Sequence, residues 1–528
     1  MKIYKKEVLK SYVEKKLNPI IKQYKNKSRF CKKELLDFLN NDTDLKICGL
    51  YGLRRTGKSV LMYQTIQDIG FTNCVYINCS NADNYLELEN EIEVLEEKYI
   101  FIDEVTKIED FINLSSSLAE DYPDKKIVIA GTDSASILFS KGSELYDRIH
   151  LIHTTYISYA EYNYLLGKSL EEYIRYGGTL TDGKTIYNDE DSLEEYTNTA
   201  IISNICKSVK NGRNNIEYKR LYDLLISDSL ESAINKTIEI RAREFSLKVM
   251  TSIFNKSHIF GSAKDLILKE RKELNKKDIE TIVNWKNKEI CDYIISRVKI
   301  EKADNVEERD TELITNFLVK LDVLTRLPNG EIIFTQPGMQ YCLAEILIEG
   351  IVNTSEYMSL FPNTQQKLLE KIHQDAVGNI LENVIRVDMI KSPSLTKMRI
   401  NKLDFNGDGE FDLYIINPDN GKAIVYEIKR SSKIVENQYK HLINEDFCND
   451  FQISHQCQII EKTVIYNGNT QILENGVRYY NVEELLKDID TFTKSLYESE
   501  NKNILDTSHQ STVTKSSSTI KDTDSFNK

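Results

Sequence analysis

The chain has 528 residues, 41% of them hydrophobic, and carries a formal net charge of -13 at pH 7. A chain of this length is expected to form about two to four domains with several hydrophobic cores. The acidic balance excludes a protein that coats nucleic acid over its whole surface, although it leaves room for local basic faces. The nine cysteines show no C-x-x-C spacing, so we expect free, mostly buried thiols in a reducing compartment.

Residues 1–44 are charged and have a helical pattern, and the basic N-terminus lacks an apolar signal segment. No run of about 18 apolar residues occurs, so we expect a soluble cytoplasmic protein without a membrane partner. An apolar run from Leu45 to Tyr51 is the first predicted strand of a core at residues 45–167. Strand and helix patterns then alternate, which predicts a parallel sheet with helices on both faces. The further predicted strands are residues 74–78, 99–103, 127–131 and 150–157.

The first predicted strand leads into a glycine, four residues and Gly-Lys-Ser, and a helical pattern follows. This is the pattern of a phosphate-binding loop (P-loop), whose backbone N–H groups surround phosphates at a helix N-terminus. Lys58 would reach the β and γ oxygens, and Ser59 would offer its hydroxyl to Mg²⁺. We predict ATP and Mg²⁺ as cofactors. The predicted nucleotide-binding residues are Gly52, Arg54, Arg55, Thr56, Gly57, Lys58, Ser59 and Val60.

The third predicted strand ends in the acidic pair Asp103 and Glu104. Phosphoryl transfer requires a carboxylate for the metal and a group that polarises the attacking water, so we assign these roles to Asp103 and Glu104 in that order. A strand end that merely happens to be acidic is the alternative. After the next strand, Thr132 or Ser134 could sense the γ-phosphate, and a helix N-cap is an equally good interpretation.

These motifs resemble the prokaryotic AAA-type P-loop ATPases that carry a C-terminal domain of unknown function (DUF4143). The resemblance rests on the P-loop, the Ile-Asp-Glu strand end, and residues 130–134, 145–148 and 156–162. In that family the arginine before the last core strand is a candidate finger for the γ-phosphate, and Arg148 has that place. It would act in cis or across the interface of a homo-oligomer. The alternative is an ordinary surface arginine.

The segments after the core are predicted to be helical at first. Residues 168–300 have charged helical patterns and are interpreted as a lid or insertion. In residues 301–367, a helix at 311–321 precedes a Pro-Asn-Gly hairpin, which is typical of a winged helix. The resembled family has such a unit in the same place. Winged helices bind DNA or separate domains, and we favour the spacer because no Lys and Arg cluster marks the helix.

Residues 368–495 contain a helical pattern with Glu382 and then strands at 409–416 and 423–429. On these strands Asp412, Glu427 and Lys429 resemble the D…E-x-K core of restriction-endonuclease-like nucleases, and the resemblance to the ATPase family extends to this segment. Glu427 and Lys429 share a strand face. Asp412 and Glu427 could hold one or two Mg²⁺ ions, with Glu382 as a further ligand. Lys429 would help to deprotonate the water that attacks a phosphodiester.

Two other interpretations compete for this segment. A solvent-facing Glu-Lys pair on an edge strand is common, and a nuclease fold does not guarantee its chemistry. Residues 404–409 begin like an EF-hand loop, but Ile415 takes the position of the required glutamate, so a hairpin turn is favoured. Residues 496–528 are rich in serine and threonine and are predicted to be disordered.

The sequence therefore predicts an α/β protein with a P-loop NTPase parallel sheet, a helical lid, a winged helix and a restriction-endonuclease-like α/β domain. Its expected function is ATP hydrolysis coupled to a nuclease-like module that acts on DNA. The alternative is a nucleotide-dependent switch or scaffold, in which an inactive nuclease fold only binds nucleic acid or protein.

Overall fold

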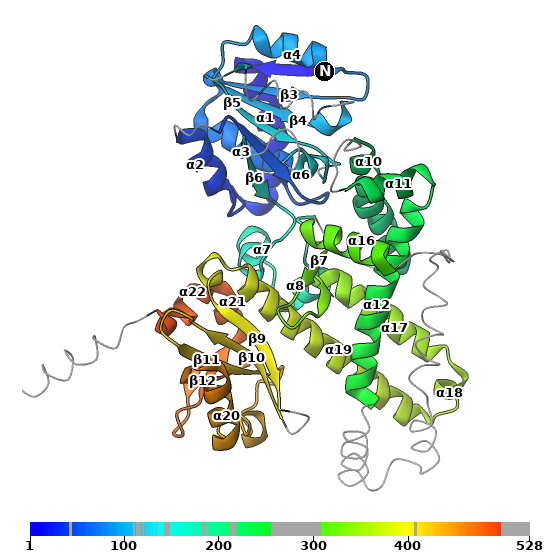
Figure 1. The fold of residues 1–528 in the computed structure, drawn as a ribbon, viewed down its shortest axis with the longest axis vertical. Helices are drawn as coiled ribbons and strands as arrows, with labels where there is room; N and C mark the ends of the chain where they lie inside the picture. The colour runs from blue at the N-terminus through cyan, green and yellow to red at the C-terminus, as the bar shows by residue number, and fades with distance from the viewer. Residues whose placement is uncertain are drawn as a thin grey trace, which may run out of the picture. The chain divides into compact units, whose positions relative to one another are not determined.

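The computed structural model describes most of the chain (Figure 1). The described residues are 1–41, 45–108, 111, 118, 121–122, 124–133, 135–141, 148–181, 186–187, 189–211, 218–254, 308–405 and 409–497. Ser134, residues 255–307 of the predicted lid and winged-helix segments, and residues 498–528 of the predicted tail lie outside them. The chain divides into two compact units, Met1–Ile390 (unit 1) and Lys391–Lys528 (unit 2), which are treated separately below.

A six-stranded sheet forms the N-terminal part of unit 1, in the order β1-β3-β4-β5-β2-β6. All neighbouring pairs among β2 to β6 are parallel, which confirms the five predicted core strands. Because the strands are parallel, their carboxyl ends meet at one edge of the sheet, where ligands bind in open α/β folds. The five strands are β2 Ile47–Tyr51, β3 Cys74–Asn78, β4 Tyr99–Asp103, β5 Lys126–Ala130 and β6 Ile149–His153.

The first residues of the chain form a strand, where the sequence pattern predicted helix. β1 (Lys2–Lys5) pairs antiparallel with β3 at the edge of the sheet. Ile3 packs against the core on one face and Tyr4 against the core on the other, so four residues suffice to extend both cores. The predicted helices follow as α1 (Lys6–Tyr24) and α2 (Lys32–Asn40).

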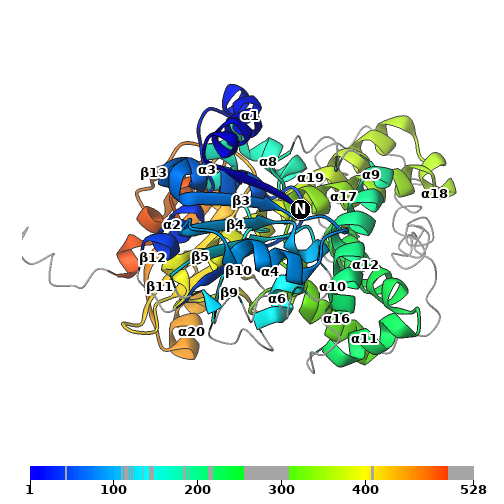
Figure 2. The same ribbon diagram turned by 90° about the horizontal axis from the view of Figure 1, so that it is seen from above.

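Helices cover both faces of this sheet (Figure 2). One core contains apolar residues of α1, α2 and α3 (Lys58–Ile69), and the other contains those of α4 (Tyr85–Glu93) and α6 (Ala135–Lys141). Neighbouring residues of a strand contribute to opposite cores, as strand geometry requires. Because both faces of these strands are buried, nearly every position must be apolar. The resulting uninterrupted apolar runs made the strands predictable from the sequence.

The rest of unit 1 is mainly helical. The predicted helix and hairpin of residues 311–334 are present as α16 (Glu308–Lys320) and the antiparallel pair β7 (Leu324–Arg326) and β8 (Ile332–Phe334). The other helices are α7 Tyr159–Leu166, α8 Leu170–Tyr176, α9 Glu190–Tyr196, a π-helix Thr197–Ile202, α10 Ser203–Asn211, α11 Lys219–Ile226, α12 Leu230–Phe254, α17 Pro337–Val352, α18 Ser355–Met358 and α19 Pro362–Lys391. None of the described helices combines the length and the apolarity needed to cross a membrane.

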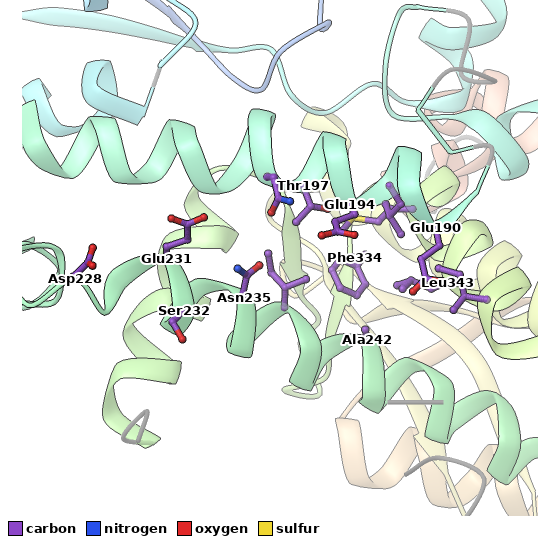
Figure 3. Close-up of a pocket in the computed structure, with 15 residues that line it drawn as sticks. Glu190, Glu194, Thr197, Asp228, Glu231, Ser232, Asn235, Ala242, Phe334 and Leu343 are labelled. Carbon is purple, nitrogen blue, oxygen red and sulfur yellow. The ribbon is translucent and has the colours of Figure 1, made fainter. Parts of the chain in front are cut away.

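A cavity of about 500 Å³ lies among α9, the π-helix, α12 and α17 (Figure 3). Asp228 and Glu231 line one end, and Phe334 and Leu343 lie towards the other. Glu190 and Glu194 add two more carboxylates, and no lysine or arginine is among the described residues that line it. An acidic cavity repels phosphates, so this cavity is not the nucleotide site.

Asp388 fixes α19 to the segment that leaves the sheet. It is 3% exposed, accepts a hydrogen bond from the Tyr156 hydroxyl, and accepts another from the backbone N–H of Tyr159 at 3.2 Å. Burial raises the pKa of Asp388 to about 7, although both hydrogen bonds oppose the rise. The folded protein therefore holds a proton on Asp388 that the unfolded chain releases.

This proton predicts a pH-dependent stability. Between about pH 4 and pH 7, Asp388 should lower the free energy of unfolding by about 1.4 kcal/mol for each unit of rising pH, and it should add no slope above that range. Asp388→Asn should remove this contribution, because the amide is neutral throughout. Urea unfolding of both proteins at pH 5, 6 and 7 measures the difference, and equal slopes would contradict the prediction.

Unit 2 contains a six-stranded mixed sheet with the strand order β13-β14-β12-β11-β10-β9. β9, β10 and β11 are antiparallel neighbours, whereas β11, β12 and β14 pair in parallel. The two predicted strands are confirmed as β10 and β11. The strands are β9 Arg399–Asp404, β10 Glu410–Ile416, β11 Lys422–Ile428, β12 Gln458–Tyr466, β13 Gln471–Ile472 and β14 Arg478–Asn481. The helices are α20 Glu445–His455, α21 Val482–Lys487 and α22 Ile489–Phe492.

Candidate functional site

The P-loop joins β2 to α3 at the carboxyl edge of the sheet of unit 1. Gly52 and Gly57 have φ values of +146° and +88°, in the region that favours glycine. A Cβ on Gly52 would lie 2.4 Å from the hydroxyl of Thr154. The loop therefore needs glycine at both ends of its pattern, for backbone conformation and for the close approach of the segment after β6.

Lys58 lies inside this loop and is 9% exposed. Its Nζ donates to the carbonyls of Gly52 at 2.7 Å and Leu53 at 2.9 Å. Burial lowers the pKa of Lys58 to about 8, against the attraction of Asp103 and Glu104. β2 and β4 both pair in parallel with β5, so the P-loop and the acidic end of β4 lie at the same edge of the sheet.

Asp103 ends β4 and is 5% exposed. It accepts hydrogen bonds from the Tyr76 hydroxyl at 2.8 Å and from the backbone N–H of Glu104 at 3.0 Å. These two bonds fix the orientation of the carboxylate at the end of β4.

Glu104 has a left-handed backbone conformation, with φ of +60°. The Thr132 hydroxyl donates to its carboxylate, at 2.6 and 2.8 Å from the two oxygens, and the Thr132 N–H lies 3.3 Å from one of them. Lys107 lies 3.6 Å away. A non-glycine residue in this conformation costs about 1–3 kcal/mol and is often functional. Thr132 thus positions the carboxylate that we assigned to the water.

A second group of charges lies beside Thr132. Asp133 is 6% exposed, and burial raises its pKa against the effects of Lys207 and Arg54. Lys207 comes from α10, and its Nζ is 3.7 Å from Asp133. The Nε of Arg54 is buried without a hydrogen-bond partner in the described structure. The loop therefore presents an unsatisfied cationic donor, which suits an anionic ligand.

Arg148 immediately precedes β6 and is exposed. In the parallel pair of β2 and β6, Ile47 lies opposite Ile149 and Tyr51 opposite His153. Arg148 is thus at the amino edge of the sheet, about 16 Å of strand away from the P-loop edge.

Sequence reasoning missed Arg29, which is 6% exposed. Its guanidinium donates to the P-loop carbonyl of Thr56, to the carbonyl of Thr154 at 3.0 Å and to the carboxylate of Glu161 at 2.7 and 3.1 Å. These partners lie 27 to 132 positions away along the chain, so no local pattern could have indicated them.

In unit 2, Asp412, Glu427 and Lys429 form one buried cluster. Asp412 and Glu427 are each 2% exposed. The Lys429 Nζ is 3.2 Å from Asp412 and 2.5 Å from Glu427, and the N–H of Ile428 donates to Asp412 at 2.8 Å. β11 lies between β10 and β12, so the interpretation as a solvent-facing pair on an edge strand is wrong.

The cluster separates the pKa values of its two carboxyl groups. Burial and the nearby Asp412 raise the pKa of Glu427 to about 8. Burial alone would raise the pKa of Asp412. Lys429 and the Ile428 N–H outweigh burial and hold this pKa below its usual value. The Oε1 of Glu427 is buried and has no hydrogen-bond partner in the described part of the chain. An orphaned carboxylate oxygen is suited to a divalent cation.

Glu382 lies on α19 in unit 1, where its carboxylate accepts a hydrogen bond from Arg386 at 3.4 Å. No group of three or more His, Cys, Asp or Glu side chains within the described ranges has the arrangement of a metal site. In unit 2, the feature that suits a cation is the orphaned oxygen of Glu427, which lies in one cluster with Asp412.

Residues 44–163 match the AAA domain family. This range contains the P-loop, the acidic strand end, Thr132 and Arg148. No curated protein matches the chain. Similar solved structures include a Walker-type ATPase of Pyrococcus abyssi, with 13% identity over 60% of this chain and 94% of that chain and a TM-score of 0.27. The RuvB Holliday junction branch migration motor of Thermotoga maritima has 17% identity over 62% of this chain and 92% of that chain, with a TM-score of 0.20. Scores this low carry no argument about function.

Proposed function

We propose that the AAA domain of unit 1 binds ATP with Mg²⁺ and hydrolyses it. The observation that carries the proposal is the convergence of Lys58, Asp103 and Glu104 at the carboxyl edge of the parallel sheet. Release of phosphate from ATP by the purified protein tests it directly. Absence of both ATP binding and phosphate release would overturn it.

In this mechanism Lys58 exchanges two loop carbonyls for phosphate oxygens, which are stronger acceptors because they are charged. Ser59 and Asp103 would hold Mg²⁺, which neutralises phosphate charge when bound. Glu104 accepts a hydrogen bond from the attacking water, which increases the electron density on the oxygen of the water. Thr132 fixes the orientation of Glu104, so little reorganisation is needed when the water reacts.

Thr132→Val should therefore lower kcat for ATP by about tenfold or more and change KM little, because it misplaces a general base without removing a phosphate contact. Steady-state phosphate release measures both constants. Thr237→Val is the matched control, since it removes a fully buried threonine hydroxyl that donates to the Ala233 carbonyl at 2.8 Å in α12. Equal kcat values in Thr132→Val and wild type would contradict the assignment.

The placement of Arg148 supports a homo-oligomer in which each copy supplies this arginine to the ATP of its neighbour. We further propose that α16, β7 and β8 act as a winged-helix spacer between the ATPase core with its helical lid and the C-terminal unit.

For unit 2 we propose a restriction-endonuclease-like domain that cleaves DNA with Mg²⁺. The buried cluster of Asp412, Glu427 and Lys429, with its orphaned carboxylate oxygen, supports this function. Asp412 and Glu427 would hold the ion, and Lys429 would orient the water. One observation favours the alternative of an inactive fold in a nucleotide-dependent switch or scaffold. Lys429 already pairs with both carboxylates, which partly compensates their charges.

A further inference from the structure

We propose that Arg29 is a positioning residue for the P-loop and that, through Tyr156 and Asp388, it connects this loop to helix α19. The proposal rests on the ATP binding proposed above. It goes further because it assigns a route, within unit 1, by which ATP binding at the loop affects α19. Unit 2 begins at the C-terminal end of this helix.

The first observation is that Arg29 uses its complete set of donors. Nε and Nη2 bind the two oxygens of Glu161 at 2.7 and 3.1 Å. Nη1 donates to the carbonyls of Thr56 and Thr154, and Nη2 also donates to the carbonyl of Tyr156 at 3.0 Å. A guanidinium has five N–H donors in a rigid fork, and here each has an acceptor. Lysine, with three donors on one atom, cannot reproduce this geometry.

The second observation ties Lys58 to Arg29. The carbonyl of Leu53 accepts hydrogen bonds from Lys58 Nζ and from the Thr56 hydroxyl, both at 2.9 Å. The Thr56 carbonyl accepts from Arg29. When Lys58 Nζ binds a phosphate oxygen, it gives up its hydrogen bond to the Leu53 carbonyl. The Thr56 hydroxyl remains bonded to the same carbonyl. Thr56 therefore lies between the bond that changes and the guanidinium of Arg29, and it is hydrogen-bonded to both sides.

The third observation is the link from Arg29 to α19. Arg29 binds the carbonyl of Tyr156, and the hydroxyl of the same tyrosine donates to Asp388. The N–H of Tyr159 donates to the second oxygen of Asp388 at 3.2 Å. Asp388 is three residues from Lys391, where α19 ends. Residues 156–159 are thus held between the guanidinium and α19 by directional bonds at buried positions.

Contact alone does not demonstrate coupling, so the test measures it in the full-length protein. Calorimetry gives the ATP affinity, and hydrogen exchange gives the ATP-induced change in protection of residues 380–391. Tyr156→Phe removes only a hydroxyl. We expect its ATP affinity to stay within about threefold of wild type and its exchange response in α19 to fall by at least about fivefold. Tyr187→Phe is the matched control, because its buried hydroxyl donates to Gln336 at 2.6 Å outside the route.

Arg29→Lys tests the positioning role. It should weaken ATP binding by about tenfold or more, whereas Arg220→Lys, which alters the ion pair with Asp310 in the same unit, should leave the affinity unchanged. If Arg29→Lys does not fold, Glu161→Gln provides the second measurement, since it removes the charge that orients Arg29.

The outcomes separate this proposal from the ATPase function. A wild-type protein that binds no ATP would overturn the proposed function, and this proposal with it. ATP binding without a change in α19, or with the same change in Tyr156→Phe, would overturn the connection alone. Unchanged ATP affinity in Arg29→Lys and in Glu161→Gln would overturn the positioning role.

Discussion

Lys58→Ala is expected to reduce phosphate release from ATP by at least about a hundredfold, the usual effect of removing a preorganised donor to developing charge. Lys58 is buried in the P-loop, and its Nζ donates to the carbonyls of Gly52 and Leu53, which it would exchange for phosphate oxygens. Alanine leaves no cation there. ATP binding, measured by calorimetry, should weaken together with turnover.

The matched control is Lys126→Met, which removes another buried lysine of unit 1, in this case from the sheet. Lys126 is 3% exposed at the start of β5, and its Nζ donates to the Leu45 carbonyl at 2.9 Å, at the edge opposite the P-loop. This change should affect stability and leave turnover of the folded protein unchanged. Wild-type turnover in Lys58→Ala would refute the nucleotide site.

The P-loop could be recognised in the sequence because its parts are local. A P-loop needs glycine where φ is positive and a lysine at a fixed spacing, and both requirements are met within eight neighbouring residues. The acidic strand end followed from a buried apolar run. In contrast, the bond from Thr132 to Glu104 depends on β4 and β5 being neighbours, which the motif does not specify.

Contacts between distant segments could not be predicted. Arg29 occurs in a charged segment without a motif, and its partner Glu161 lies 132 positions later. β1 is four residues long, too short for a period of two to be recognised against the helical pattern that follows.

The sequence pattern assigns the helix around Glu382 to the nuclease-like domain, with a predicted start at residue 368. In the structure it is part of α19, a 30-residue helix that belongs to unit 1 up to Ile390. Amphipathicity shows which face of a helix is buried, but it does not show which neighbour covers that face. The assignment of Glu382 as a metal ligand thus stays a prediction without support from the cluster in unit 2.

The largest effect in unit 2 is expected from Lys429→Ala, which should lower Mg²⁺- or Mn²⁺-dependent cleavage of plasmid and linear DNA by about a hundredfold or more. Lys487→Ala, which breaks an exposed ion pair with Glu483 in the same unit, is the control. Cleavage by wild type and its loss in Lys429→Ala would establish the nuclease. If Lys58→Ala also loses cleavage, cleavage depends on ATP.

Metal binding distinguishes a variant that has lost a catalytic group from one that has lost a metal ligand. Lys429 is a cation within 3.2 Å of both carboxylates, so its removal relieves repulsion of a divalent ion. Lys429→Ala should therefore bind Mn²⁺ at least as tightly as wild type, whereas Glu427→Gln should bind it about tenfold or more weakly, because an amide cannot supply the negative charge that the carboxyl group supplies once the ion displaces its proton. Calorimetry measures both affinities without reference to cleavage. Mn²⁺ binding without cleavage in wild type would favour the switch or scaffold, and no Mn²⁺ binding in wild type would refute the metal site itself.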